Sequence, residues 1–393
     1  MRLGVLTLHD SLNYGALLQA YALRSRLTSL GHEAVVIDRC RSERALARQV
    51  PSASAGTFRL GGVFPVSAHD GLAEYARRMA RSYAFVRERI GLSPHGFVDW
   101  NDAPADLGLD AVVVGSDQVW NANRHDPGDY LLGTLPRRLR GISYAASFGM
   151  SDVPETDREK FVRGLSGFSA LGIREREGVE LARRLGFRAD QVVDPVLLAG
   201  KEIWNAVLAT GERASPGRVF CYFLAEDFPA MVPALAGFSK SSGKRIDFFV
   251  DRFLRPRPQT FRRYWRNRRF WERCAAAGVD FRLDAGPEEF VRSIAAADAV
   301  VTNSYHALMF ALVFDKEARV VLPTHPRRRQ MNARLVETGS DLTTGPLIAE
   351  SPGEALASLA AGERVSVRCE ELSARVRFSA QWLSEKLAEL EGT

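Results

Sequence analysis

The sequence predicts an α/β fold made of two Rossmann-like domains that face a cleft, with a C-terminal helix closing the fold. Short apolar runs alternate with helical patterns, as expected for parallel sheets. The alternation pauses near residue 194 and then restarts. Polar loops follow several of the apolar runs, at the sheet edge where α/β folds hold their ligands. We therefore expect an N-terminal domain over 1–194, a C-terminal domain over 195–369 and a terminal amphipathic helix over 370–393.

Composition is consistent with this division. The chain has 393 residues, of which 46% are hydrophobic and 25% charged, so each domain can bury a core. The formal net charge is +6 and comes mainly from arginine. This excess has two open interpretations, a general bias in composition or an acidic substrate or membrane surface.

Cysteine usage and hydropathy bear on location. The four cysteines are far apart and form no CxxC motif, which argues against a disulfide framework or a zinc site. Residues 3–8 are too short for the apolar core of a signal peptide, and no run approaches the length of a membrane span. We expect a cytoplasmic protein, at most peripheral at the inner face of the membrane.

The first forty residues predict a βαβ unit. An apolar strand over 3–8 is followed by a polar loop, then by a helix with apolar residues at helical spacing, and Gly31 stands just past the end of that helix. A second apolar strand covers 33–38. This order predicts a parallel pair and places Asn13, Tyr14 and Gly15 at the ligand edge of the sheet.

The remainder of the first half continues the pattern after a variable insertion over about 41–105. Weak periodicity over 41–70 predicts a loop, and 71–90 predicts a helix. Buried strands are expected over 110–115, 141–147 and 169–173, with helices starting near Pro154 and Arg174. The polar loop 116–121 follows the first of these strands, and residues 191–195 close this half.

The second half restarts with strands over 218–224 and 245–250. Pro287 and two acidic residues open a helix, which is the favoured order at a helix start. An apolar strand then leads to the polar turn 303–307, which is followed by an apolar helix over 308–314 and a strand over 318–322. The apolar spacing from Glu370 onward predicts the closing helix.

The turn 303–307 is the centre of the predicted site. It holds a carboxamide, a hydroxyl and an imidazole between two buried elements, beside free N–H groups at a helix start. His306 therefore becomes our candidate for proton transfer near neutral pH. Histidine and carboxylate residues show no metal-ligand spacing, so we expect no required metal or other cofactor.

Residues 252–273 stand apart, because nine arginines alternate there with six aromatic residues. No recognised nucleic-acid motif accompanies them, and we predict no nucleic-acid partner. Two interpretations stay open. One is a solvated arginine face over packed aromatic rings, and the other is contact with an anionic membrane surface or acidic glycan.

Four segments together resemble the bacterial polysaccharide pyruvyl transferases. They are residues 9–23, 114–121, 173–175 with 194–195, and 303–307, and in order and spacing they span roughly 1–335. The resemblance implies a GT-B-like pair of domains. It also implies transfer of pyruvate from phosphoenolpyruvate to two hydroxyls of a sugar, as a cyclic ketal. The partners would be this donor and a sugar acceptor, including lipid-linked precursors.

The resemblance assigns roles at these positions. The catalytic candidates are His306 as acid or base and Asp117 as the group that takes a proton from the acceptor. The donor-binding candidates are Arg174, Asn303, Ser304 and Tyr305. The candidates for the acceptor site or cleft are Asp10, Asn13, Tyr14, Gly15, Gln118, Trp120 and Asn121.

Some of these assignments compete with plainer ones. Arg174 could pair with a neighbouring glutamate, Asn13 could cap a helix and Trp120 could be a packing residue. Many relatives carry arginine at the position of Ser304, so the donor must be held elsewhere, by Arg174 or by the cluster 327–329.

Two other functions remain open from the sequence. One is a GT-B-type glycosyltransferase that uses a nucleotide sugar in the same cleft. The other is a non-catalytic protein that binds anionic glycans or membranes through 252–273.

Overall fold

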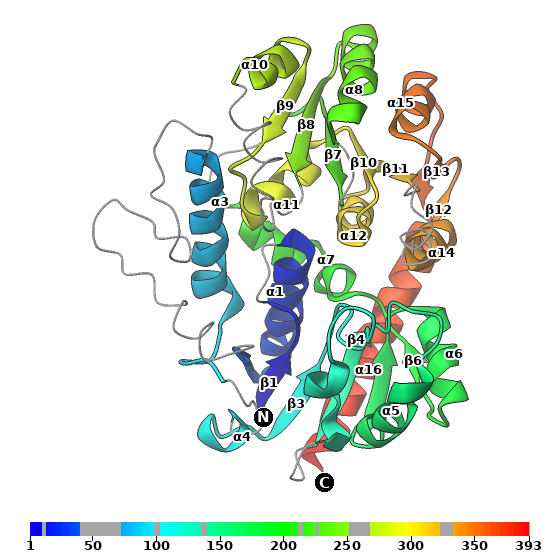
Figure 1. Ribbon diagram of the computed structural model, residues 1–393. Coiled ribbons are helices and arrows are strands. Elements are labelled where there is room, and N and C mark those ends of the chain that lie inside the picture. The colour runs from blue at the N-terminus through cyan, green and yellow to red at the C-terminus, as the bar shows by residue number, and fades with distance from the viewer. Residues whose placement is uncertain are drawn as a thin grey trace, which may run out of the picture.

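Two parallel sheets form the framework of the protein in a computed structural model (Figure 1). The structure describes residues 1–9, 13–39, 72–97, 103–134, 140–210, 215–224, 228–250, 268–322 and 333–392. Asp10, most of the insertion 41–105, the stretch 252–267 and the cluster 327–329 lie outside the described residues, so the interpretations placed on them stay predictions.

The first sheet has six parallel strands in the order β2-β1-β3-β4-β5-β6. Its strands are β1 (Arg2–Leu6), β2 (Glu33–Val36), β3 (Ala111–Val114), β4 (Gly141–Ala146), β5 (Ala170–Ile173) and β6 (Asp190–Gln191). β3 and β4 are buried along their whole length, which explains their continuous apolar or small-residue sequences. This sheet confirms the predicted parallel arrangement of the first half.

The second sheet also has six parallel strands, in the order β13-β11-β10-β7-β8-β9. They are β7 (Arg218–Phe223), β8 (Arg245–Val250), β9 (Val279–Arg282), β10 (Ala299–Thr302), β11 (Glu317–Val321) and β13 (Ile348–Ala349). A separate antiparallel pair joins β12 (Thr343–Thr344) to β14 (Ser366–Val367). The two sheets, on either side of residues 192–217, confirm an α/β protein with two Rossmann-like halves.

Strand order places the predicted loops at crevices of the sheets. β1 lies between β2 and β3, and β7 lies between β8 and β10. Connections from the two sides of such a position run in opposite directions, which opens a crevice at the carboxyl ends of the strands. The loops after β1 and β3 meet at the first crevice, and the loops after β7 and β10 meet at the second.

The helix α1 (Tyr14–Ser29) connects the two halves (Figure 1). Residues 14–23 are all buried, because the helix packs between its own sheet and the helices of the second half. Its main partner is α7 (Pro195–Leu208), and the Tyr21 ring lies 5.7 Å from the Trp204 ring, centroid to centroid. α11 (Pro287–Ala296) and α12 (Tyr305–Val313) complete this helical layer.

The other helices pack against the sheets or against neighbouring helices. They are α3 (Leu72–Phe85) with a π-helical extension (Val86–Ile90), α4 (Ala103–Asp106), α5 (Arg158–Leu165), α6 (Arg176–Arg184), α8 (Phe228–Ser242), α10 (Arg268–Ala276), α14 (Ala333–Leu342) and α15 (Pro352–Ala360). Single 3-10 turns cover Pro127–Tyr130, Leu132–Thr134 and Glu155–Asp157. The helices expected near residues 71, 154, 174 and 287 are all confirmed.

The last helix, α16 (Cys369–Glu391), returns from the second half to the first (Figure 1). Trp382 packs beneath β5, and its Nε1 donates a hydrogen bond to the Asp190 carboxylate over 2.7 Å. A methyl group added at Gly172 would lie 2.8 Å from the Trp382 ring, so glycine leaves room for the indole. The predicted closing helix is confirmed, and it packs on the first sheet.

We predict that Trp382→Ala lowers the free energy of unfolding by about 3–5 kcal/mol, because a buried indole is replaced by a cavity. Urea denaturation followed by circular dichroism measures this. Gln381→Ala on the exposed side of the same helix is the matched control, with an expected change below about 0.5 kcal/mol. Equal destabilisation by the two substitutions would contradict the docking of α16 through Trp382.

Candidate active site

A buried ion pair between Arg174 and Asp194 lies where the two halves meet. Arg174 follows β5, and Asp194 caps α7 by accepting the Val196 N–H over 2.9 Å. The Arg174 Nη1 donates to Asp194 Oδ2 over 2.8 Å, and the Ser116 hydroxyl donates to the same oxygen over 3.3 Å. Both charged side chains are almost completely buried. The predicted donor-binding arginine is thus held between two strand ends of the first sheet.

His306 reaches the same carboxylate from the second half. Ser304 caps α12, and its hydroxyl accepts the Ala307 N–H over 3.4 Å. This cap fixes the first turn of the helix, in which His306 is the second residue. The His306 Nε2 lies 3.5 Å from Asp194 Oδ2 and makes no hydrogen bond with the described residues. The His306 side chain is 10% exposed, so it lies at the edge of the packed interior.

Gly15 allows α1 and α12 to approach at this point. A methyl group placed on Gly15 would lie only 2.2 Å from the His306 Nδ1. Two helix starts, at positions 15 and 306 of the sequence, are therefore in direct contact. This contact places the start of α1 against the turn 303–307.

Tyr305 provides a second contact between the halves. Its ring centroid lies 4.5 Å from the Arg174 Cζ, a cation–π distance. The start of α12 therefore approaches the ion pair with an aromatic face from Tyr305 and an imidazole from His306. Both residues were predicted from the sequence. That Tyr305 contacts Arg174 while His306 lies beside Asp194 was not.

The guanidinium of Arg174 faces three carboxylates. Besides Asp194, Asp117 lies 3.9 Å from Nη2 and Glu175 lies 4.0 Å from Nε. Burial opposes the charge of Arg174, but Asp194 and the neighbouring acidic groups raise its pKa above the ordinary range. Nε and Nη2 are buried and make no hydrogen bond with the described residues. These two nitrogens form one edge of the guanidinium, which faces the carboxylates of Asp117 and Glu175.

The Asp194 carboxylate is held in its charged form. Burial favours the protonated acid, but His306 and Arg174 outweigh it and hold the pKa of Asp194 well below its ordinary value of 3.8. Because the folded-state pKa is lowered, the carboxylate stabilises the fold above pH 3.8, and this contribution is lost as the pH falls below that value.

The loop 115–121 presents Asp117 and buries its neighbours. Asp117 has a left-handed backbone with φ of 68° and a side chain that is 19% exposed. Gln118 and Asn121 are buried and hydrogen-bonded to each other over 2.8 Å, and the buried Trp120 indole donates to the Tyr130 carbonyl. These three side chains shape the loop, and Asp117 remains as its partly exposed acid. Strained backbone of this kind is concentrated at functional sites.

The loop before α1 also has a supporting role. Asn13 caps the helix by accepting the Ala16 N–H over 3.2 Å, as the plainer interpretation expected. Tyr14 is fully buried, stacks on Phe290 and donates its hydroxyl to the Ala285 carbonyl over 2.8 Å. Its side chain therefore fastens α1 to the second half and does not line an open cleft.

Asn303 likewise organises the backbone. Its Oδ1 accepts the Leu224 N–H over 2.6 Å, which ties the loop after β10 to the loop after β7. Asn303 and Ser304 thus lie at the predicted crevice of the second sheet, buried within its rim.

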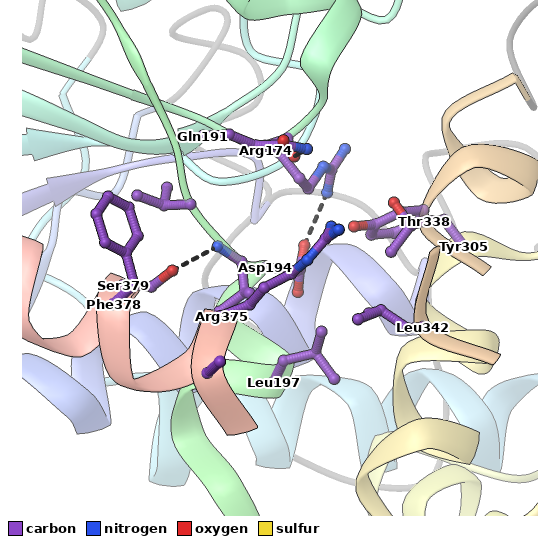
Figure 2. Close-up of a pocket in the computed structure, with 13 residues that line it drawn as sticks. Arg174, Gln191, Asp194, Leu197, Tyr305, Thr338, Leu342, Arg375, Phe378 and Ser379 are labelled. Carbon is purple, nitrogen blue, oxygen red and sulfur yellow. Dashed lines mark hydrogen bonds and ion pairs between the residues drawn. The ribbon is translucent and has the colours of Figure 1, made fainter. Parts of the chain in front are cut away.

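A cavity of about 390 Å³ adjoins the ion pair (Figure 2). It lies between the first half, α7, α12, α14 and α16. Figure 2 shows Arg174 and Arg375 extending into this region from opposite walls, with Asp194 between them. The lining also includes Tyr305, Leu197, Leu342 and Phe378. A space of this size accommodates a small metabolite.

The family follows from a direct comparison. A family model described as polysaccharide pyruvyl transferase matches residues 13–325, which is most of the chain and includes Asp117, Arg174, Asp194 and His306. The chain belongs to the polysaccharide pyruvyl transferase family. The resemblance found in the four sequence segments is therefore confirmed.

Several solved structures are similar in fold to this member of the pyruvyl transferase family. UDP-N-acetylglucosamine 2-epimerase from Rickettsia bellii matches with a TM-score of 0.53 and 11% identity, covering 99% of this chain and 95% of the other. MurG of Acinetobacter baumannii matches with a TM-score of 0.43 and 13% identity, covering 99% of each chain. At these identities the likeness concerns the fold alone, which is GT-B-like as predicted. Among curated proteins, no match is found.

Sequence reasoning missed several polar residues that hold the site together. The Gln19 carboxamide accepts the Ser116 N–H over 3.1 Å and donates to the Thr7 hydroxyl over 2.9 Å, which joins the loops after β1 and β3. His9 Nε2 lies 3.0 Å from Asp38 Oδ1 at the same edge. Gln19 falls within the segment 9–23 that carried the family resemblance. The sequence therefore marked this residue as part of a motif but did not indicate its function.

The described residues lack two kinds of feature. They contain no group of three or more histidine, cysteine or acidic side chains arranged to hold a metal ion. None of their helices is both long enough and apolar enough to cross a membrane.

We predict that Gly15→Ala destabilises the protein by about 1–3 kcal/mol and displaces the His306 ring, because the added methyl has no space. The melting temperature and any transfer activity would both decrease. Gly353→Ala is the matched control, since its nearest neighbouring atom would be 3.8 Å away. A Gly15→Ala protein as stable and active as the wild type would contradict the contact between α1 and α12.

Proposed function

We propose that this member of the family transfers pyruvate from phosphoenolpyruvate to two hydroxyls of a sugar, in a polysaccharide or a lipid-linked precursor, and forms a cyclic ketal. The observation that carries the proposal is the convergence of Arg174, His306 and Asp117 where the crevices of both sheets meet. An anion holder, a proton-transfer group and an acid near the sugar side are the groups that this reaction needs.

The chemistry is balanced in protons. Two hydroxyl oxygens of the acceptor bond to C2 of the donor, and the bond from C2 to the phosphate oxygen breaks. Of the two protons lost by the hydroxyls, one becomes the third hydrogen of the new methyl group and the other leaves with phosphate. A group that donates a proton to the methylene carbon and one that accepts a proton from a hydroxyl are therefore both required.

Arg174 supports the donor assignment. Its Nε and Nη2 have no hydrogen-bond partner among the described residues, and Tyr305 covers one face of the guanidinium. Such an edge binds a carboxylate or phosphate in a two-pronged manner. Arg375, which also lines the adjoining cavity, is a second described cation that could assist, since Ser304 replaces the arginine of many relatives.

His306 and Asp117 support the proton transfers. We assign His306 to the methylene carbon of the donor, because it lies beside the donor-binding arginine through Asp194 and Tyr305. We assign Asp117 to the acceptor hydroxyl, because its carboxylate is partly exposed and lies 3.9 Å from the donor-binding group Arg174, at a different nitrogen from the one that Asp194 contacts. The donor would then lie between Arg174 of the first half and His306 of the second, with the acceptor beside Asp117.

Ligand binding tests the donor. We predict that phosphoenolpyruvate raises the melting temperature of the protein and that nucleotide sugars leave it unchanged, because Arg174 and the cavity suit a small anion. Differential scanning fluorimetry with inorganic phosphate and pyruvate as controls measures this. If only a nucleotide sugar stabilised the protein, the result would contradict the proposal and favour a glycosyltransferase.

Two substitutions separate binding from chemistry. We predict that Arg174→Lys weakens phosphoenolpyruvate binding about tenfold or more, because a lysine cannot present two parallel N–H groups. We predict that His306→Gln leaves binding within about threefold and lowers kcat by about 10²–10⁴. Calorimetry gives the binding constants, and phosphate release with a panel of glycoside acceptors gives kcat. Unchanged kcat in His306→Gln would show that another group transfers the proton.

A further inference from the structure

The carboxamide of Gln19 is a buried polar group that the proposed chemistry does not use. Gln19 lies in α1 and is inaccessible to solvent. Its Oε1 accepts the Ser116 N–H over 3.1 Å, and its Nε2 donates to the Thr7 hydroxyl and to the Ala16 carbonyl, each over 2.9 Å. Both polar atoms of this side chain are therefore occupied, by α1 itself and by the loops after β1 and β3.

The partners fix the direction of each hydrogen bond in this network. The Ser116 N–H can only donate and the Ala16 carbonyl can only accept, so the carboxamide of Gln19 fits in one orientation. The Thr7 hydroxyl donates its single proton to the Ser116 carbonyl over 2.9 Å and therefore accepts from Gln19. A flipped carboxamide would place two donors together on one side and two acceptors together on the other.

Both peptide groups that flank Ser116 are held in this way. Gln19 binds the N–H of Ser116, and Thr7 binds its carbonyl, which belongs to the peptide group that leads into Asp117. Beyond this point the Asp117 carbonyl accepts the Ser147 N–H over 3.0 Å. The backbone is thus fixed on both sides of Asp117, whose left-handed conformation with φ of 68° persists only with such support.

The same face of α1 also meets His306. Gly15 lies four residues before Gln19, so the two residues project from one side of the helix, one turn apart. Gly15 sets how closely His306 approaches α1, and Gln19 sets where the loop of Asp117 lies. One turn of a single helix therefore connects the two groups to which we assign proton transfer.

We propose that Gln19 is a positioning residue that holds Asp117 at a fixed place relative to His306, with Thr7 as its partner. Gln19 touches no substrate and acts through the Ser116 backbone. A displacement of about 1 Å can lower the rate of a reaction about 100-fold, and this network prevents such a displacement. The kinetic consequence rests on the proposed function, whereas the hold on the loop 115–121 does not.

The first test measures the hold on this loop without any substrate. Gln19→Met keeps a side chain of similar length but loses its hydrogen bonds. We therefore expect amide hydrogen exchange of the segment 115–121 to become about tenfold faster or more. Mass spectrometry of peptides from the segment measures the exchange. Exchange as slow in Gln19→Met as in the wild type would overturn the inference, whatever the activity of either protein.

Two substitutions of Thr7 test the network from its other end. Thr7→Val replaces the hydroxyl by a methyl group and should also accelerate exchange of 115–121 about tenfold. Thr7→Ser keeps the hydroxyl, so its exchange should stay within about threefold of the wild type. Equally fast exchange in Thr7→Ser and Thr7→Val would overturn the inference, even if Gln19→Met did not fold.

Thr343→Val is the matched control for Thr7→Val. The buried Thr343 hydroxyl donates to the Gly339 carbonyl over 2.7 Å, at the start of the antiparallel pair in the second half. The substitution thus removes a comparable buried hydrogen bond away from the loop of Asp117. We expect it to leave the exchange of 115–121 unchanged, and acceleration equal to that in Thr7→Val would contradict a specific hold.

Kinetic measurements test whether the hold serves the reaction. We expect Gln19→Met to lower kcat about 10–100-fold and to change the KM for phosphoenolpyruvate less than about threefold, since Arg174 keeps its ion pair with Asp194. In an Asp117→Asn background the same substitution should lower kcat less than about threefold, because the group that it positions is already lost. In a His306→Gln background the full loss should remain.

The three backgrounds separate positioning from a general loss of structure. An equal fall of kcat in all of them would overturn the positioning role, because a general distortion does not depend on the presence of Asp117. If the wild-type protein shows no transfer from phosphoenolpyruvate, the proposed function fails, and hydrogen exchange still decides whether Gln19 holds the loop of Asp117.

Discussion

The Asp194 carboxylate is the interaction on which the arrangement of the site depends. It lies where the chain leaves the first sheet, and it caps the helix that packs against α1 and α12. Asp194 therefore lies at the boundary between the first half and the connection to the second. Its carboxylate contacts Arg174 from the first sheet and lies beside His306 from the second half. Buried ion pairs add little net stability on average, because the cost of removing charges from water offsets their attraction. The value of this one is geometric, since it fixes the distance between two functional groups.

Close packing of α1 makes that geometry attainable. Residues 14–23 of the helix are all buried. A surface helix exposes one face, so burial on every side is typical of a helix enclosed between two layers. Gly15 and Tyr14 serve this packing in opposite ways, one by leaving space for His306 and the other by bonding to Ala285. The fold is shared with the UDP-N-acetylglucosamine 2-epimerase from Rickettsia bellii, and a shared fold does not fix the chemistry, which resides in the side chains of each site.

The candidate site could be predicted in part. The loops that carry Asn13, Asp117, Arg174 and His306 were placed at strand ends, and the structure brings all four loops to one region. The roles of individual side chains were harder to predict. Gln118, Trp120 and Asn121 resemble ligand-binding residues in sequence, yet they are buried and hold the loop of Asp117. A polar residue looks the same in sequence whether its partner is a ligand or the backbone, because the partner is fixed by tertiary contacts.

The sequence by itself determined the alternation of strands and helices, the two parallel sheets, the closing helix and the family, because apolar periodicity and short motifs are local properties. The tertiary structure alone decided the strand order, the short strands β6, β9 and β13, and the meeting of residues 15, 174, 194 and 306. It also decided that Arg174 faces three carboxylates and that Asp194 remains charged. These features depend on the packing of two sheets and on burial, and neither is encoded in a stretch of sequence short enough to show a pattern.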